Sequence, residues 1–460
     1  MQVRSRRRFW LQLLAVVLVS AVVLAYLLAF ATRHGFFDLK IYRGAVRYWA
    51  AGGELYRYIY PRTIYGFTYP PFAAITMLPM SLFTVNVTAS ISSVGIALGI
   101  TVLAFWLFGP IAQRHGLSRW FVVALAVPLL CALDPIHETM AFGQVNVFLL
   151  AVVAFDVLFG VARGRRWGGI LIGLATAVKL TPGIFIVYLL VTRRWRAAIT
   201  ASAAAAAATL LAAAVMPHES WVFWTDAIWH TDRIGRIDFV SNQSVAGLIA
   251  RAFDHAYATG WVLLPLTLAV LAVWFVKSRR AVFGGDEVAG LALTGLCQIL
   301  VSPISWIHHL TWAVPAFAVL FGGVLDARDR RRRLVLGGVL VVSFLVLASS
   351  LPWVRDVTVK HHHDWGVWGV LIANSYGFVM LAMLLAIPVR DAFRTRGDRP
   401  PAVGELLAPP PPWPWRRGSQ PVAEEPAPSA EEGRPAAEAG RPPAEARKPS
   451  ASGDPVSTSA

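Results

Sequence analysis

Apolar runs long enough to cross a lipid bilayer recur along this chain from Phe9 to Pro388. A membrane-spanning helix needs about 20 predominantly apolar residues, because each residue adds only about 1.5 Å along the helix axis. Hydrophobic residues make up 56% of the 460 residues and charged residues only 15%, which argues against an ordinary soluble core. The sequence therefore predicts an all-α polytopic membrane protein.

The basic residues occur in short clusters between the apolar runs. Arg4 to Arg8 precede the first run, Trp10 to Phe30, which is too long and too poorly ended for a cleavable signal peptide and is interpreted as a retained anchor. Later clusters lie at 114–119, 163–166, 193–196, 277–280, 328–333 and 390–399. Because basic loops stay on the cytoplasmic side, both termini are expected in the cytoplasm and the protein in the plasma membrane. The net charge of +16 thus reflects topology, and no nucleic-acid partner is expected.

The alternation of basic clusters assigns the longer, aromatic and acid-containing loops to the outer face, at 31–85, 134–143, 217–259, 302–309 and 352–366. The segment 168–191 has basic clusters on both sides and Lys179 to Gly183 in its middle, which is too short for two crossings. We expect two short helices that enter and return, with Lys179 at a turn that protein or a water-filled cavity shields. The prediction is about ten full crossings plus this re-entrant helix pair, with short helices in the outer loops.

Three parts of the chain differ in composition: a basic N-terminus at 1–9, a membrane-embedded domain at 10–390, and a tail at 391–460 rich in Pro, Ala and Glu. The tail cannot bury enough apolar surface to fold, so it is expected to be disordered and cytoplasmic.

Cys131 and Cys297 offer neither metal-ligand spacing nor a disulfide framework. Three consecutive histidines in a loop, such as His361 to His363, form a solvated and weakly binding tract more often than a specific metal site. No specific metal site is therefore expected. The chain has no phosphate-binding or dinucleotide fingerprint, so neither a nucleotide-activated substrate nor a cofactor is expected.

Asp38 is the first candidate for chemistry. If 38–49 is helical at about 100° per residue, Asp38, Tyr42 and Trp49 share one face while Lys40, Arg43 and Arg47 share the opposite one. This pattern indicates an interfacial helix with its acid on the apolar side. A carboxyl group there has a raised pKa, which makes it a better general base near neutral pH. The alternative is that Asp38 merely caps the helix.

Histidine and lysine residues supply candidate cationic groups. His308 and His309 lie where an outer loop enters a helix, and adjacent helical positions diverge so that only one can readily face a given pocket. They are candidates for binding phosphate or sugar, although a backbone-satisfied histidine is about as common. Lys179 could bond the last carbonyls of its short helix. However, a lysine at membrane depth costs about 2.5–3.5 kcal/mol, so a lipid phosphate is its natural counter-ion.

The outer loops also carry candidate substrate-binding side chains. Aromatic rings stack on sugars, while amides and arginine bond hydroxyl groups and phosphate. The candidates are Tyr42, Tyr69, Arg236, Asn242, Gln243 and Trp306. Anchoring in the aromatic belt explains several of the neighbouring tryptophans at least as well.

Six short motifs occur in order along the chain. They are Asp38-Leu39-x-x-Tyr42, Gly53-x-Leu55-Tyr56, Phe67-Thr68-Tyr69-Pro70-Pro71, Lys179-Leu180-Thr181-Pro182, Ser241-Asn242-Gln243-Ser244 and Ser302-Pro303-x-Ser305-Trp306-x-His308-His309. Through these motifs the chain resembles the actinobacterial polyprenol-phosphate-mannose-dependent α-(1→2)-mannosyltransferases of glycosyltransferase family 87, in the GT-C superfamily. The resemblance covers roughly residues 10 to 390. The tail departs from that pattern.

The resemblance implies a GT-C-like fold and specific roles. Asp38 would be the catalytic base, and His308 or His309 would assist in the active site. The donor would be a β-linked mannosyl phosphate lipid and the product an α-linked mannoside, so the anomeric centre inverts. The acceptor would be a glycolipid, either a phosphatidylinositol mannoside or the lipomannan and lipoarabinomannan built from it.

Two alternatives stay open. Relatives of that family use a polyprenyl-phosphate-arabinose donor, and no residue pattern separates the two sugars. A lipid or sugar transporter or flippase is the alternative from another class, because transporters are also polytopic with broken helices. The polar residues here gather in the outer loops rather than at the midplane, which favours an enzyme. The oligomeric state is not predicted.

Overall fold

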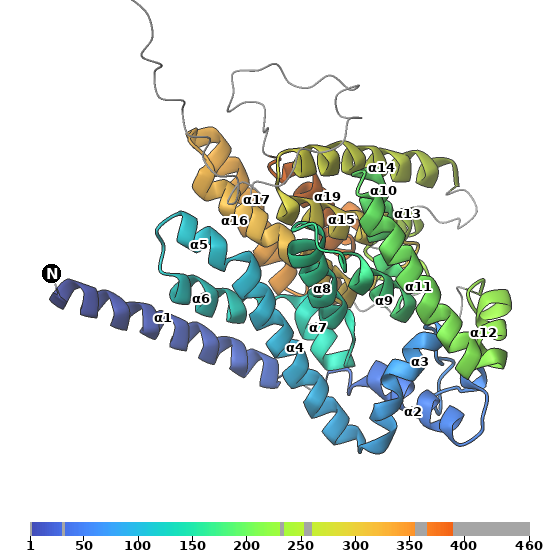
Figure 1. The fold of residues 1–460 in the computed structure, drawn as a ribbon. Coiled ribbons are helices and arrows are strands. Elements are labelled where there is room, and N and C mark those ends of the chain that lie inside the picture. Colours follow the sequence, from blue (N-terminus) through green and yellow to red (C-terminus); the bar gives the residue numbers. More distant parts are fainter. Residues whose placement is uncertain (1, 30–32, 231–233, 253–259, 355–365, 390–460) are drawn as a thin grey trace, which may run out of the picture. The chain divides into compact units, whose positions relative to one another are not determined.

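The computed structural model describes residues 2–29, 33–230, 234–252, 260–354 and 366–389 of the chain, and these form a set of packed helices (Figure 1). Over the described residues, β-pairing is confined to one isolated antiparallel bridge between Ile59 and Gly66. The all-α class is therefore confirmed. The predicted tail at 391–460 and the tract His361–His363 lie outside the described residues.

Six helical segments of the described chain are long and apolar enough to cross a membrane. They are Arg6–Ala29 in α1 (Gln2–Ala29), Val85–Arg114 in α4 (Val85–Leu107) and α5 (Gly109–Arg114), Trp195–Val215 (α11), Gly260–Phe283 (α14), Ile307–Asp326 in η7 (Ile307–Ala313) and α16 (Val314–Asp326), and Arg330–Val354 in α17 (Arg330–Ala348) and η8 (Leu351–Val354). Two bent pairs raise the number to eight, namely α6 (Arg119–Cys131) with α7 (Asp134–Phe142) and α18 (Gly366–Ala373) with α19 (Ser375–Ala386). The protein is thus a multi-pass membrane protein, and the expected ten crossings stay a prediction.

Helix α1 and the central helices differ in what surrounds them. Leu14, Leu18 and Val22 of α1 are more than half exposed, as expected for side chains that meet lipid. By contrast, every residue of α15 (Glu287–Val301) from Ala289 to Leu300 is buried. Because α15 is apolar on all sides, it can lie at the centre of the bundle, where it contacts α10, α14, α16 and α19.

The two cysteines lie among the packed helices. Cys131 ends α6 and Cys297 lies in α15; both are buried, and neither forms a disulfide. Both therefore act as small apolar side chains in the packing of the helices.

A smaller apolar core forms apart from the main bundle, under the segment that follows α1. It involves α2 (Phe37–Ala50), η1 (Leu55–Arg57), α3 (Pro71–Met77), η2 (Leu78–Leu82), α12 (Pro217–Val222) and η5 (Phe223–Ala227). Figure 1 shows α2, α3 and α12 together near one end of α11. Buried Glu219 accepts a hydrogen bond from the backbone N–H of Leu55 at 2.9 Å, which joins the two parts of this layer across 164 residues of sequence.

The segment 168–191 forms two short helices on either side of Lys179, in agreement with the sequence-based expectation. Helix α9 (Ile170–Val178) is followed by η4 (Thr181–Gly183) and α10 (Ile184–Val191). Glycines 169 and 173 lie against the carbonyl groups of Ala197 and Ala201, so α9 runs alongside α11 in the same direction. Since α10 ends just before α11 begins, the pair enters and leaves at the same end of α11.

Buried Asp156 holds the beginning of this pair. It opens the π-helical segment η3 (Asp156–Val161), which follows α8 (Asn146–Phe155). Its two carboxylate oxygens accept hydrogen bonds from the backbone N–H groups of Gly169 and Ile172, at 2.8 and 3.0 Å. These are donors that the first turn of α9 would otherwise leave unpaired, so Asp156 has a structural role.

Candidate active site

Asp38 lies in the first turn of α2 rather than at its N-cap. Phe36 occupies the N-cap in the left-handed region, with φ 56°, and no side chain caps the helix. On the helix, Tyr42 and Ala45 are buried while Arg47 is exposed, so the predicted division into two faces is present. The capping alternative for Asp38 is therefore wrong, and its carboxylate is turned toward the protein.

Gln144 is the hydrogen-bond partner of Asp38. Its side-chain amide donates to Asp38 Oδ2 at 2.6 Å. The approach is possible because Gly143, which ends α7 with φ 71°, lies so close to α2 that a Cβ there would be 2.6 Å from Cβ of Leu39. Only glycine tolerates both this conformation and this contact.

Two tyrosines complete the surroundings of the acid. Tyr42 hydroxyl lies 2.8 Å from Gln144 Nε2 and 3.0 Å from Tyr69 hydroxyl, which in turn donates to Gln144 Oε1 at 2.9 Å. Tyr56 donates to the backbone carbonyl of Tyr69 at 2.7 Å and so fixes the loop. Burial raises the pKa of both Tyr42 and Tyr69 above the usual value, so both phenols keep their protons.

The environment tunes Asp38 for proton transfer. Loss of solvent around the carboxyl group raises its pKa to about 6, while the hydrogen bond from Gln144 and the charge of Lys179 act in the opposite direction. A base with a pKa near 6 is ionised at neutral pH yet still basic enough to accept a proton. This is the raised pKa that the sequence led us to expect.

Lys179 lies at the break between α9 and η4, next to the Tyr69 ring. Its ammonium group donates to Asn146 Oδ1 at 2.9 Å, lies 3.1 Å from His309 Nε2, and sits 5.1 Å from the centre of the Tyr69 ring. Among the described residues, its hydrogen-bond partners are side chains and not the last carbonyl groups of α9, which was the structural alternative considered for this lysine. Instead, the lysine is 7% exposed and its positive charge faces the side on which Asp38 lies.

The structure separates the two adjacent histidines. His309 faces Lys179, and its Nδ1 accepts from the backbone N–H of Trp306 at 3.2 Å. His308 is turned toward Phe142, its ring is 4% exposed, and its backbone carbonyl accepts from Thr139 and Asn146. The two rings lie nearly perpendicular to each other. His309 is therefore the one that lies next to the cationic group.

The remaining predicted substrate-binding residues lie in a different setting. Asn242 and Gln243 are fully buried and bond backbone groups: Asn242 contacts the loops at Ile237, Pro303 and Ser305, and Gln243 contacts Val240, Ala373 and Gly377. The Asn242 amide holds the loop before α13 (Val245–Ala252) against the Ser302–Trp306 loop, and the Gln243 amide holds it against α18 and α19. Arg236 is exposed and forms an ion pair with Asp238, while Trp306 packs edge-on against Phe239. Hydrogen bonds join none of these four side chains to Asp38 in the described chain.

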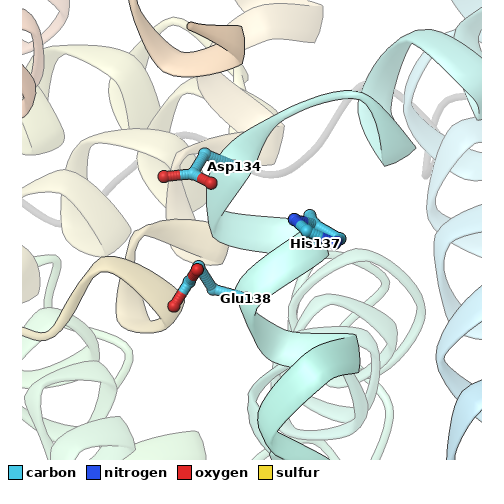
Figure 2. A group of neighbouring side chains, drawn as sticks. All are labelled: Asp134, His137 and Glu138. Atoms are coloured by element: carbon cyan, nitrogen blue, oxygen red, sulfur yellow. The ribbon is translucent and has the colours of Figure 1, made fainter. Parts of the chain in front are cut away.

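A second polar group, the α7 charge cluster, consists of Arg33, His34, Asp134, His137 and Glu138. Arg33 lies 3.8 Å from Asp134 and 3.6 Å from Glu138, and His34 lies 2.9 Å from Glu138. Figure 2 shows the side chains of Asp134, His137 and Glu138, which all come from α7. One donor atom from each of these three residues lies within 4.8 Å of the others, so they could hold a cation. However, Arg33 already places positive charge beside both carboxylates.

Hydroxyl groups also bond Asp134. Ser350 and Tyr376 donate to its two oxygens at 2.8 and 3.0 Å. These contacts link α7 to the helices near the C-terminal end of the described chain.

An apolar groove of about 350 Å³ opens beside the Lys179 turn. It is lined by Pro70, Thr176, Ala177, Leu180, Ala205, Ala206, Thr209, Leu210 and Trp224. Pro70 follows Tyr69 in the chain, and Leu180 follows Lys179. The groove therefore adjoins the residues that carry the polar side chains.

Sequence reasoning missed Gln144 and Asn146. Gln144 lies in the turn between α7 and α8, and Asn146 is the first residue of α8, just beyond the outer loop predicted at 134–143. The available signal was a Gly-Gln-x-Asn sequence directly before an apolar helix, since buried amides in such a place need partners. For the site that Asp38, Tyr42, Tyr69, Gln144, Asn146, Lys179 and His309 form together, we use the name Asp38 site below.

The chain is similar to a known family of enzymes. Residues 67–303 match glycosyltransferase family 87. No solved structure matches the chain.

Curated relatives are similar over most of their length. A polyprenol-phosphate-mannose-dependent alpha-(1-2)-phosphatidylinositol mannoside mannosyltransferase of Mycobacterium tuberculosis is 32% identical over 81% of this chain and 89% of its own. A polyprenol-phosphate-mannose-dependent alpha-(1-2)-phosphatidylinositol pentamannoside mannosyltransferase of Mycolicibacterium smegmatis is 34% identical over 69% of this chain and 76% of its own. An alpha-(1->3)-arabinofuranosyltransferase of Corynebacterium glutamicum is 24% identical over 62% of this chain and 67% of its own. The chain therefore belongs to glycosyltransferase family 87 and is a membrane glycosyltransferase rather than the transporter considered above.

Proposed function

We propose that this enzyme transfers mannose from a polyprenyl-phosphate-mannose lipid to a mannoside glycolipid and forms an α-(1→2) linkage with inversion. The acceptor would be a phosphatidylinositol mannoside or the lipomannan and lipoarabinomannan built from it. The printed activities of the mycobacterial relatives support the donor and the acceptor class. The observation that carries the proposal is that a carboxylate and a cationic group, Asp38 and Lys179, lie near each other beside an apolar groove.

Asp38 is the proposed general base. The acceptor hydroxyl loses its proton to the carboxylate as its oxygen attacks the anomeric carbon of the donor. A side chain with a pKa of about 6 can accept that proton at neutral pH. Positioned general bases contribute roughly 10²- to 10⁴-fold to the rate, so this group carries a large share of the proposed chemistry.

Lys179 and His309 are proposed to bind the donor phosphate. As the new bond forms, the bond between the anomeric carbon and the phosphate oxygen breaks, and its electron pair stays on that oxygen. The ammonium group of Lys179 and the imidazole of His309, 3.1 Å apart, can meet the charge that develops there. Because the acceptor attacks opposite the leaving phosphate, a single displacement converts a β-linked donor into an α-linked product. His308 stays a candidate through its contact with His309.

The remaining predicted binding residues have proposed supporting roles. Tyr42 and Tyr69 would line the sugar pocket by their ring faces, since their hydroxyl groups are engaged with Gln144. Arg236, from the loop before α13, and Trp306, from the loop between α15 and η7, would bind the acceptor. Asn242 and Gln243 would act through the backbone groups that their amides bond.

The apolar groove is the proposed place of the polyprenyl chain. It adjoins Lys179 through Leu180 and lies against α11, a candidate membrane span. A lipid in the groove would place its phosphate at Lys179 while the chain stays in an apolar environment. The basic clusters of the loops favour the extracytoplasmic face for the site, with both termini in the cytoplasm.

Arabinofuranosyl transfer is the second candidate function. It is supported by the similarity to the arabinofuranosyltransferase of Corynebacterium glutamicum, at lower identity than the mannosyltransferases. The two candidates differ in the donor sugar and in the linkage that the relatives' names give, and the same base and cationic group could act in either reaction.

The purified enzyme, incubated separately with mannosyl and arabinosyl polyprenyl phosphate and defined phosphatidylinositol mannosides, tests the proposal. We expect mannose transfer and a product that an α-(1→2)-specific mannosidase cleaves. Transfer of arabinose alone would replace the main candidate by the second one. Product with the β-configuration would show that inversion from a β-linked donor is wrong.

A further inference from the structure

Gln144 is the centre of a closed ring of hydrogen bonds. Its Nε2 donates to Tyr42 hydroxyl, and Tyr69 hydroxyl donates to its Oε1. Tyr69 has then used its only proton, so Tyr42 must donate in the bond of 3.0 Å between the two hydroxyl groups. The three bonds run in one direction around the ring. The second proton on Nε2 is left over, and it points to Asp38 Oδ2 at 2.6 Å.

The orientation of the Gln144 amide is fixed by Asp38. If the amide were turned over, its oxygen would face a carboxylate oxygen at the same short distance, and the ionised acid has no proton to share. Oδ2 of Asp38 is therefore occupied by an N–H donor. Oδ1 accepts no hydrogen bond from the described residues, which leaves its lone pairs for an incoming proton.

Asn146, two residues further on, holds Lys179. Its Oδ1 accepts from Lys179 Nζ at 2.9 Å, and its Nδ2 donates to the backbone carbonyl of His308 at 3.1 Å. Both Gln144 and Asn146 are nearly fully buried. One short turn between α7 and α8 thus contacts the acid through one amide and the cation through the other.

We propose that Gln144 and Asn146 are paired positioning residues that set the distance between the base Asp38 and the phosphate-binding group Lys179. This inference rests on the proposed function and adds to it the residues that hold the two reacting groups apart. If Asp38 and Lys179 met directly, they would neutralise each other. A neutral amide on each group orients it without cancelling its charge.

The geometry also assigns a role to the tyrosine hydroxyl groups. Each phenol gives its proton to a neighbour in the ring, so neither retains a proton to donate to a sugar. Tyr42 and Tyr69 therefore keep Gln144 in place. Replacing Tyr69 by Phe should shift the pH profile in the same direction as replacing Gln144, because the ring then lacks one of its bonds.

The two residues call for two different measurements. Gln144→Met removes both donors at nearly constant length. Since the bond from Gln144 lowers the pKa of Asp38, we expect the acidic limb of kcat/KM to move from near pH 6 to higher pH, by about one unit, with a fall of about tenfold to a hundredfold in kcat at pH 7. Asn146→Leu should leave that limb in place. It should instead raise the inhibition constant of the product analogue undecaprenyl phosphate by about tenfold, because Lys179 loses its partner.

The controls separate positioning from general damage. Gln113→Met makes the same change at an exposed position of α5 and should match the wild type in both measurements. If Gln144→Met does not fold, as judged by its elution in detergent, Gln144→Glu replaces it, because glutamate preserves the shape of the side chain. The like charge of glutamate beside Asp38 should move the acidic limb of kcat/KM at least as far. A variant that merely loosened the fold would lower the rate at every pH without moving the limb.

The inference is overturned if Gln144→Met and Gln144→Glu keep the acidic limb of kcat/KM at its wild-type pH. It is also overturned if Gln144→Met and Asn146→Leu have the same effect on this limb and on the inhibition constant of undecaprenyl phosphate. Failure of the proposed function has a different signature. In that case the wild-type enzyme itself would show no mannose transfer from the lipid donor, whatever the variants do.

Discussion

The Asp38 site and the α7 charge cluster both bury carboxylates and cationic groups, but they pair them differently. In the cluster, Glu138 contacts His34 and lies 3.6 Å from Arg33. In the Asp38 site, the acid and Lys179 each have a neutral amide as hydrogen-bond partner. The cluster therefore pairs its opposite charges directly, whereas the site keeps Asp38 and Lys179 on neutral partners.

The two regions share one helix. The cluster lies at the beginning of α7, and Gln144 lies directly after its end. His34 and Asp38 are likewise only four residues apart, and His34 is among the groups that lower the pKa of Asp38. We infer that the cluster fixes α7, and that α7 carries the turn on which the Asp38 site depends. Mutations in the two regions should then have opposite consequences for stability and for chemistry.

The largest effect is expected for Asp38→Asn. Asparagine keeps the shape and the contact with Gln144 but cannot accept the proton of the acceptor hydroxyl. We expect kcat to fall by roughly 10²- to 10⁴-fold while the thermal unfolding temperature in detergent stays near that of the wild type. The matched variant Asp134→Asn should keep kcat near the wild-type value and lower the thermal unfolding temperature. Wild-type kcat in purified Asp38→Asn enzyme would remove Asp38 from the role of base.

A smaller loss of activity is expected for Lys179→Met. Methionine fills a similar volume without the charge, so the leaving phosphate loses one of its two proposed stabilising groups. A fall in kcat of about a hundredfold is expected, in the range found for removing one preorganised donor. Lys277→Met is the control, because Lys277 bonds backbone carbonyls of α19 away from the pocket. Equal losses in the two variants would mean that the charge at 179 has no special place in the reaction.

For Glu138→Gln we expect a change in stability and little change in chemistry. His34 and Arg33 lose the charge of their partner, and a bond between charged groups contributes about 1.5–3 kcal/mol. Thermal unfolding in detergent should therefore shift to lower temperature while kcat at pH 8 stays near the wild-type value. Loss of kcat without loss of stability would contradict the division between the two regions and would place Glu138 in the reaction.

Much of this arrangement follows from local sequence. The spacing of Asp38, Tyr42 and the basic residues around them predicted the two faces of α2, because a single helix decides which residues share a side. Lys179 stood out because a charged residue beside Pro and Gly in an apolar run predicts a break. The histidine pair was found as well, although only the structure shows that His309 rather than His308 meets Lys179.

The rest depends on contacts between distant segments. Gln144 bonds Asp38 across 106 residues, and Asn146 bonds Lys179 across 33, and no periodicity encodes such pairs. Asn242 and Gln243 show the converse difficulty. A polar loop sequence does not reveal whether its amides face a ligand or the backbone of the next loop, and here they bond the backbone. Long-range packing decides both cases.

The smallest effect is expected in the apolar groove, where the change alters the fit of a lipid and leaves the polar site intact. Ala206→Phe should fill part of the groove and raise KM for a long polyprenyl donor by about tenfold, as expected for the loss of 1 to 2 kcal/mol of apolar contact. A donor with a chain of two isoprene units reaches less of the groove, so its KM should change little. Ala203→Phe, at an exposed position of α11 outside the groove, is the control. If both donors respond equally to Ala206→Phe, the polyprenyl chain lies elsewhere and the groove has no part in donor binding.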